Sequence, residues 1–257
     1  MRDPGLAQAI QAVGGVSELA RRIGISQPSV SNWDKVPAER VLAVEAATGI
    51  ARVRLRPDLY QEPSATEIDD IDLARSREYA LLSALLARAP DAGLLTQLAR
   101  LGGDASPLGL AHLALAQAAA NADLTKVERE YFDLFIGLGR GELMPYGSYY
   151  LTGFLNERPL ARLRDDLAAI GVERVEGNYE PEDHAATLCE IMSGLAGGTL
   201  SGPEGAERRL FEKHMAPWIG RFFADLERAD AANFYRHVGT AGRVFVEIET
   251  QAFALPS

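Results

Sequence analysis

The sequence predicts an all-α protein, with a small N-terminal helix-turn-helix bundle followed by a larger helical domain. Apolar residues recur every three or four positions along most of the chain, which is the spacing of one helix face. The β-branched segment 244–248 resembles a strand, but no second segment offers to pair with it. A change in charge near residue 60 separates the two predicted domains.

The composition fits a folded protein of one large or two small domains. The chain has 257 residues, of which 47% are hydrophobic, and its mean hydropathy is −0.07. No apolar run approaches the roughly 18 residues of a membrane-spanning helix, and the first residues lack the pattern of a signal peptide. The single cysteine, Cys189, excludes an intrachain disulfide. These features predict a cytoplasmic protein without a membrane span.

The charge is unevenly distributed. Residues 1–60 carry eight Lys or Arg against six Asp or Glu, a net charge of +2. The whole chain carries −10, so the remainder carries −12. Two prolines and several acidic residues favour a linker between the two parts. We therefore predict a helix-turn-helix domain at 1–58, a linker at 59–72 and a helical domain at 73–257.

The N-terminal part has the pattern of a helix-turn-helix. One helix is predicted over 16–23 and is closed by Gly24, and a second over 27–33 with Ser26 as its N-cap and Pro28 in its first turn. In this motif the second helix enters the major groove of DNA. The side chains predicted to face outward, and to read base edges, are Gln27, Ser29, Ser31 and Asn32.

These residues resemble the Cro-like helix-turn-helix of YdaS-type antitoxins over about residues 5–60, including the segment 55–60. The resemblance implies DNA binding. A charge of only +2 keeps a second interpretation open, because phosphate contacts supply most non-specific affinity for DNA. In that interpretation the bundle serves for docking or dimerisation.

Beyond the linker, apolar periodicity predicts a series of helices. Proline and glycine mark several of their ends: Pro90 and Gly171 follow helices, Pro181 begins one and Pro217 kinks one. The predicted helical segments are 79–89, 107–122, 124–135, 160–170, a helix beginning at 181, 204–229 and 231–253.

Catalytic and metal sites find little support in the sequence. The glycine-rich segment 137–141 lacks the Lys-Ser/Thr pair of a phosphate-binding loop. Asp183 next to His184 has no accompanying serine elbow or activated cysteine, and the other histidines have no metal-ligand spacing. We expect no enzyme activity, no metal and no cofactor.

Three motifs carry a family resemblance: Tyr131-x-x-Leu134-Phe135, Pro145-Tyr146-Gly147-Ser148-x-Tyr150 and Glu180-Pro181-x-Asp183-His184. Over about residues 75–255 the chain resembles the TorD/DmsD family of cytoplasmic chaperones, which mature molybdenum-cofactor redox enzymes. The resemblance implies an all-helical domain that binds the twin-arginine signal peptide and the apo-form of its client before export. The residues that it and the motifs single out for peptide binding are Tyr131, Leu134, Phe135, Pro145, Tyr146, Ser148, Glu180, Asp183 and His184.

The expected ligand agrees with the residue chemistry. A twin-arginine signal peptide has a basic segment followed by an apolar segment, so its receptor should combine aromatic surface with carboxylates. Among the predicted contact residues, Asp183 is expected to bind an arginine side chain of the peptide. His184 is expected to orient Asp183 or to sense its ionisation. Residues 218–226 resemble family members associated with formate dehydrogenases.

The competing hypothesis is a DNA-binding transcription regulator whose body senses a ligand or peptide. Both a monomer and a homodimer stay open.

Overall fold

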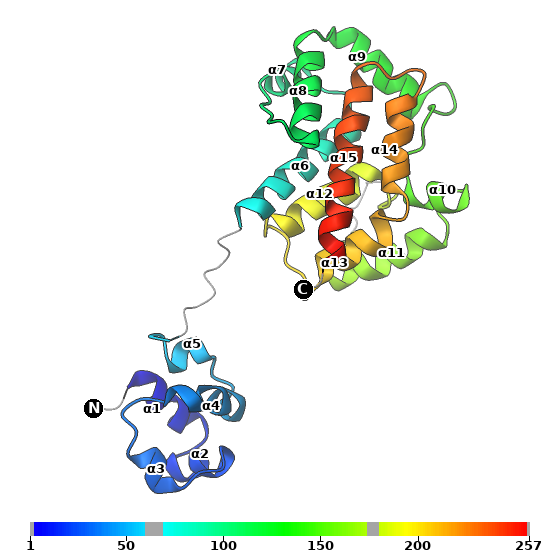
Figure 1. Cartoon of the computed structure of the whole chain (residues 1–257). Helices are drawn as coiled ribbons and strands as arrows, with labels where there is room; N and C mark the ends of the chain where they lie inside the picture. Colours follow the sequence, from blue (N-terminus) through cyan, green and yellow to red (C-terminus); the bar gives the residue numbers. More distant parts are fainter. Residues whose placement is uncertain (1–2, 60–68, 174–179, 256–257) are drawn as a thin grey trace. The chain divides into compact units, whose positions relative to one another are not determined.

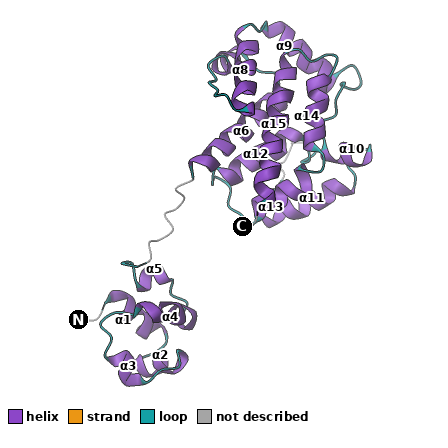
Figure 2. Ribbon diagram, viewed as in Figure 1, coloured by secondary structure: helices purple, strands orange, loops and turns teal. Residues whose placement is uncertain are grey.

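The computed structural model describes residues 3–59, 69–173 and 180–255. Every regular element in these ranges is a helix, which confirms the predicted all-α class (Figures 1 and 2). Residues 1–67 form one compact unit and residues 68–257 a second one. Residues 60–68 of the predicted linker lie outside the described residues. None of the described helices has both the length and the apolar character needed to cross a membrane.

The N-terminal unit is a bundle of short helices around its own core. Leu6, Leu19, Val30 and Leu55 are fully buried there. Gly24, with φ of +71°, makes the tight turn between the two helices of the motif, a conformation that glycine adopts without a steric penalty. The elements are α1 (Pro4–Ala12), α2 (Val16–Arg22), α3 (Gln27–Ser31), the 3-10 helix η1 (Ala38–Arg40), α4 (Val41–Thr48) and α5 (Arg52–Leu55).

The second unit, the body, contains α-helices and two single-turn π-helices, η2 and η3. Its elements are α6 (Asp70–Ala87), α7 (Ala92–Leu98), α8 (Pro107–Ala120), α9 (Leu124–Tyr131), η2 (Phe132–Ile136), α10 (Gly147–Thr152), α11 (Arg158–Ala169), α12 (Ala185–Ala196), α13 (Ala206–Leu210), η3 (Phe211–Met215), α14 (Ile219–Arg228) and α15 (Phe234–Ala254).

Large apolar side chains hold the helices of the body together. α12 packs against α6, and α15 packs against both α14 and α8 (Figure 1). Trp218, Tyr79, Tyr235 and Phe222 are fully buried in the same core. Burial of one such side chain stabilises the fold by roughly 1.5–3 kcal/mol, so this core fixes the positions of the loops around it.

The helix predicted to begin at Pro181 begins four residues later, at Ala185. Residues just before it pair with the loop ahead of α10: Gly147 N donates to the Asp183 carbonyl, and Ala185 N donates to the Pro145 carbonyl. Residues 182–183 form a turn and the backbone at His184 is held extended by these bonds, so this segment cannot join the helix. The predicted break at Pro217 is confirmed, because α14 begins only at Ile219.

Candidate functional site

Tyr146 and His184 meet where the loop after η2 crosses the start of α12. They form an isolated β-bridge, and their rings stand edge to face with centroids 5.0 Å apart. The Tyr146 hydroxyl donates a hydrogen bond to the carboxylate of Glu180. Burial raises the pKa of Tyr146, and its hydrogen bond to Glu180 raises it further. At neutral pH this hydroxyl is therefore a hydrogen-bond donor.

Tyr131 and Phe135 form a second aromatic pair that packs against the hydrophobic core, and we use the term aromatic surface for these two residues together with Tyr146 and His184. The rings of Tyr131 and Phe135 lie 5.1 Å apart and both contact Tyr235. Burial raises the pKa of Tyr131, and the negative charge of Glu180 raises it further. All four side chains of the aromatic surface are half-buried.

His184 has a structural task besides its ring contact. Its Nδ1 accepts a hydrogen bond from Ala186 N at 3.1 Å, so the imidazole serves as the N-cap of α12. Burial lowers the pKa of His184 against the opposing charges of Glu180 and Asp183. A neutral ring that accepts at Nδ1 carries its proton on Nε2, where it can serve as a hydrogen-bond donor.

Four of the predicted contact residues are buried, so they do not form the aromatic surface. Leu134 has no exposed surface and belongs to the hydrophobic core, and Pro145 is buried as well. Asp183 is 3% exposed, and its Oδ2 accepts from Ser148 N at 2.6 Å. Because Tyr146 provides no side-chain cap for α10, the carboxylate of Asp183 caps that helix from a distant segment. Sequence spacing alone could not distinguish this role from direct ligand contact.

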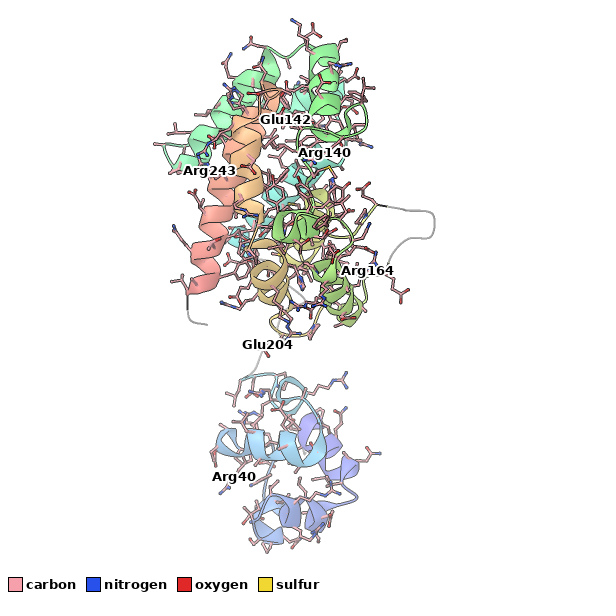
Figure 3. All side chains as sticks on the ribbon, turned by 90° about the vertical axis from the view of Figure 1, so that its right-hand side faces the viewer. Arg40, Arg140, Glu142, Arg164, Glu204 and Arg243 are labelled. Carbon is pink, nitrogen blue, oxygen red and sulfur yellow. The ribbon has the colours of Figure 1, made fainter. Side chains whose placement is uncertain are left out.

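A groove of about 500 Å³ lies beside Glu180, between α11 and α12. The residues on its apolar side are Leu167, Ala168, Val172, Ile191 and Leu200. Its acidic residues are Glu173, Glu180, Glu182 and Glu190. Arg164, on α11 (Figure 3), also lines it and is held by Glu182 at 2.8 Å. Glu180 lines the groove and accepts a hydrogen bond from Tyr146, so the groove adjoins one residue of the aromatic surface.

Sequence reasoning predicted apolar and aromatic side chains beside carboxylates, but it placed them at Tyr131 and Tyr146 and did not find the apolar residues between α11 and α12. Leu167 and Ile191 appeared in the sequence as ordinary core positions of two helices, and both are largely buried. The acidic rim contains Glu182, which the third motif carries only as a variable position. The available signal was the density of carboxylates at 180–183 beside a helix with an apolar face.

In the N-terminal unit, α3 presents a polar face. Gln27, Ser29 and Asn32 are exposed and Ser31 is half-buried. Gln27 Nε2 donates to Ser31 Oγ at 2.7 Å, so these side chains form a hydrogen-bonded set on one side of the helix. Ser26 stands at the N-cap position as predicted, but its hydroxyl pairs with Ser29 Oγ at 2.7 Å instead of capping the helix.

Among the described residues, no group of three or more His, Cys, Asp or Glu side chains is arranged to hold a metal ion. Cys189 is fully buried, and burial raises the pKa of its thiol to about 12. A thiol in that state is a poor nucleophile and a poor metal ligand.

Two known families match the chain, one in each of the two units described above. Residues 102–224 match the family model described as nitrate reductase delta subunit. Residues 6–64 match the family model described as bacterial toxin YdaS.

Individual relatives follow the same division. The chaperone protein TorD of Vibrio cholerae is 28% identical over 127 residues, which are 46% of this chain and 58% of that protein. TorD of Shewanella pealeana is 26% identical over 196 residues, covering 66% of this chain and 85% of that protein. The proposed transcriptional regulator YdaS of Escherichia coli K12 is 47% identical over 58 residues, covering 20% of this chain and 59% of that protein.

A solved structure also resembles the chain. The crystal structure of a proposed redox enzyme maturation protein from Archaeoglobus fulgidus has 24% sequence identity and a TM-score of 0.46. The likeness covers 66% of this chain and 93% of that one.

Proposed function

With a YdaS-type region joined in one chain to a TorD-type region, we propose that the body is a cytoplasmic, non-catalytic chaperone for a molybdenum-cofactor oxidoreductase. It binds the twin-arginine signal peptide of the apo-enzyme and assists maturation before export. A formate dehydrogenase is the proposed client, on the resemblance of residues 218–226.

The observation that carries this proposal is that Glu180 lines the apolar groove and also accepts a hydrogen bond from Tyr146 of the aromatic surface. A signal peptide presents a basic pair and then an apolar run. The apolar residues between α11 and α12 suit the run, and the four glutamates around them suit the basic pair. The net charge of −12 beyond residue 60 also favours encounter with a cationic peptide.

A peptide titration tests the proposal. Synthetic peptides with an Arg-Arg, Lys-Lys or Gln-Gln pair before one leucine-rich run are titrated against the full chain by calorimetry. The Arg-Arg peptide is expected to bind about tenfold more tightly than the Lys-Lys peptide, because a guanidinium can bind a carboxylate through two parallel hydrogen bonds. Equal affinity of all three peptides would contradict recognition of the basic pair.

Matched variants locate the site. Glu180→Gln removes one charge from the groove and is expected to weaken the Arg-Arg peptide about tenfold, which corresponds to about 1.4 kcal/mol. Glu247→Gln removes the same charge from an exposed position on α15 and should leave the affinity unchanged. His184→Asn preserves an N-cap for α12 while removing the ring from the aromatic surface. If Glu247→Gln weakens binding as much as Glu180→Gln, only the overall charge matters.

A second proposed function belongs to the N-terminal unit, because α3 exposes short hydrogen-bonding side chains after a glycine turn. It would bind DNA and act in transcription regulation. In a gel-shift with the DNA upstream of its own reading frame, the expected affinity falls steeply with salt and falls again in Asn32→Ala. The absence of a salt-dependent shift would instead favour the interpretation of the unit as a docking or dimerisation module.

A further inference from the structure

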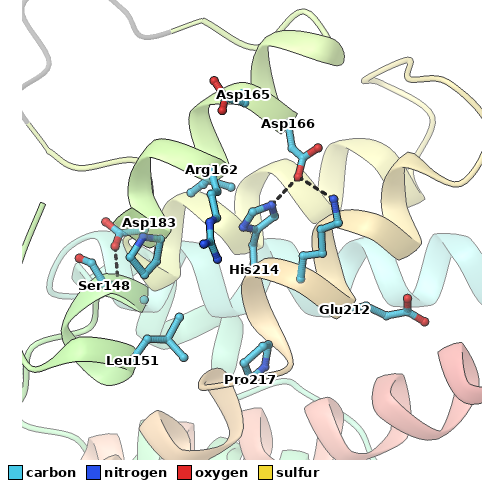
Figure 4. A pocket seen from close by; sticks show the side chains of 13 residues that line it. Ser148, Leu151, Arg162, Asp165, Asp166, Asp183, Glu212, His214 and Pro217 are labelled. Carbon is cyan, nitrogen blue, oxygen red and sulfur yellow. Dashed lines mark hydrogen bonds and ion pairs between the residues drawn. The ribbon is translucent and has the colours of Figure 1, made fainter. Parts of the chain in front are cut away.

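Arginine predominates in one pocket of the body, whereas carboxylates predominate in two others. The groove between α11 and α12 contains four glutamates and one arginine, and a cavity of about 680 Å³ beside α10 (Figure 4) contains four carboxylates against one arginine and one lysine. Both follow the net charge of −12 beyond residue 60. A pocket of about 560 Å³ between the end of α14 and the first half of α15 has the opposite sign. We call its lining residues the arginine patch: Glu227, Arg228, Arg236 and Arg243.

A close helix crossing fixes the backbone under the arginine patch. A Cβ atom at Gly239 would lie 2.5 Å from Glu227 N, so the missing side chain lets α15 approach α14. Arg243, on α15 (Figure 3), donates to Glu227 at 2.8 Å and to Glu247 at 2.9 Å. Thr240 Oγ1 donates to the other carboxylate oxygen of Glu227 at 3.0 Å. These bonds hold Arg243 and Glu227 in place in the absence of a ligand.

Two arginines of the patch are available to a ligand. Arg228 and Arg236 are exposed, and the side chain of neither forms an ion pair or a hydrogen bond with a described residue. Arg228 ends α14 and Arg236 lies in the first turn of α15, so two separate guanidinium groups reach one pocket. A guanidinium can bind a carboxylate through two parallel hydrogen bonds. The pocket is therefore suited to two carboxylates at once.

The lining of the pocket favours an acidic protein segment over a nucleotide or a phosphate ion. No apolar or aromatic side chain lines it, so a base or an acyl chain would find no surface on which to pack. A phosphate ion would fill only a small part of the pocket, and Glu227 repels a doubly charged group more strongly than a single carboxylate. Two carboxylates three residues apart on an extended chain are separated by roughly 10 Å, which a pocket of this size accommodates.

We propose that the arginine patch docks an acidic segment of a partner protein, with one Asp or Glu side chain on Arg228 and another on Arg236. The negative charge of the rest of the body disfavours an acidic segment elsewhere, so these two arginines determine where the segment binds. The arginine patch shares no residue with the groove or the aromatic surface. The inference is therefore independent of the proposed peptide site and assigns the body a second kind of partner.

The test uses the full chain and short synthetic peptides. The probe contains the sequence Glu-Gly-Gly-Glu between blocked termini, and the control contains Gln-Gly-Gly-Gln. Both are titrated by ¹H–¹⁵N NMR and observed at the Nε–H groups of Arg228 and Arg236. Saturable shifts are expected with the glutamate peptide only. Inorganic phosphate is titrated in parallel and is expected to saturate these groups only at a higher concentration than the glutamate peptide.

Matched arginine variants locate the binding. Arg236→Gln is expected to weaken the glutamate peptide roughly fivefold, which is the upper range for an exposed ion pair. The double variant of Arg228→Gln and Arg236→Gln, observed at Arg243 Nε–H, should lose saturable binding. Arg100→Gln removes the same charge from an exposed residue outside the patch and should change the affinity less than about twofold.

Four results would overturn the inference. The first is the absence of saturable shifts with the glutamate peptide, and the second is equal binding of the glutamine peptide. The third is saturation by inorganic phosphate at a lower concentration than the glutamate peptide, which would make the patch a phosphate site. The fourth is an equal loss of affinity in Arg100→Gln and Arg236→Gln, which would leave only the overall charge. None of these results bears on the proposed function, and a chain that binds no signal peptide would leave this inference intact.

Discussion

Three backbone N–H groups at the start of α15 donate to one buried carboxylate. Glu130, on α9, accepts from Asn233 N at 2.8 Å, Phe234 N at 3.1 Å and Tyr235 N at 2.6 Å. The first N–H groups of a helix have no partner within it, and Asn233 supplies no side-chain cap. The carboxylate therefore performs the capping task across more than one hundred residues of sequence. It also positions Tyr235 beside the aromatic surface.

Replacing Glu130 should destabilise the body. Glu130→Ala leaves three buried donors without a partner, and the free energy of unfolding is expected to fall by about 3 kcal/mol. Glu130→Gln keeps one acceptor oxygen and should cost about half as much. Urea denaturation monitored by tryptophan fluorescence measures both, since Trp218 is buried in this core. A loss below about 0.5 kcal/mol for the alanine variant would show that water replaces the carboxylate.

At the same scale, sequence identifies residue types better than residue roles. Of the predicted contact residues, Tyr146 and His184 lie edge to face, and Glu180 accepts a hydrogen bond from Tyr146. Asp183 lies next to them in sequence, yet it is buried and its carboxylate caps α10. Its direction depends on a hydrogen bond to Ser148, 35 residues away, and no local pattern encodes that contact.

At the scale of elements, the bounds of a helix were predictable where a single residue, such as a proline in the first turn, marks its end. The segment predicted over 107–122 corresponds to α8, which has Pro107 in its first turn. The π-helices η2 and η3 were not predictable, because each closes a helical segment with a backbone hydrogen bond that spans one residue more than in an α-helix: Gly137 N donates to Phe132 O, and Ala216 N to Phe211 O. Apolar spacing does not reveal this change, because a loop follows η2 and a turn follows η3.

A hydrogen bond between α8 and α6 makes the stability of the body depend on pH. His112, on α8, lies 2.9 Å from the carboxylate of Glu78 on α6. This hydrogen bond raises the pKa of His112 above its usual value, against the opposing effect of burial, and Asp104 adds a smaller contribution. A raised pKa in the folded state means that the folded protein binds the proton more tightly. The resulting stability is complete below the unfolded pKa and is lost as pH rises through the folded pKa.

The variant His112→Gln isolates this contribution. The amide of glutamine can still donate to Glu78, but it carries no charge at any pH. We expect the wild-type chain to exceed the variant in unfolding free energy by more at pH 5.5 than at pH 8.5, as measured by urea denaturation at both values. A difference that is independent of pH would mean that His112 contributes only as a neutral hydrogen-bond donor.

At the scale of the whole molecule, the two units have separate hydrophobic cores. One cluster of buried residues includes Leu6, Val30 and Leu55, and the other includes Tyr79, Trp218 and Tyr235. The charge follows the same division, at +2 for residues 1–60 and −12 for the rest. Two cores and two charge signs suit two different partners, a polyanion for the first unit and a cationic peptide for the second.

Separate cores predict that the body keeps its stability and its ligand without the N-terminal unit. A chain of residues 69–257 is expected to unfold within about 3 °C of the body transition of the full chain, which corresponds to roughly 1 kcal/mol for a domain of this size. Its affinity for the Arg-Arg peptide should match that of the full chain. Residues 1–59 should add a distinct transition at lower temperature, because a domain of about 60 residues buries a smaller fraction of its surface. Calorimetric scanning of the full chain and the shorter chain makes the comparison. A single shared transition, or a body that loses the peptide when residues 1–68 are removed, would show that the two units act as one.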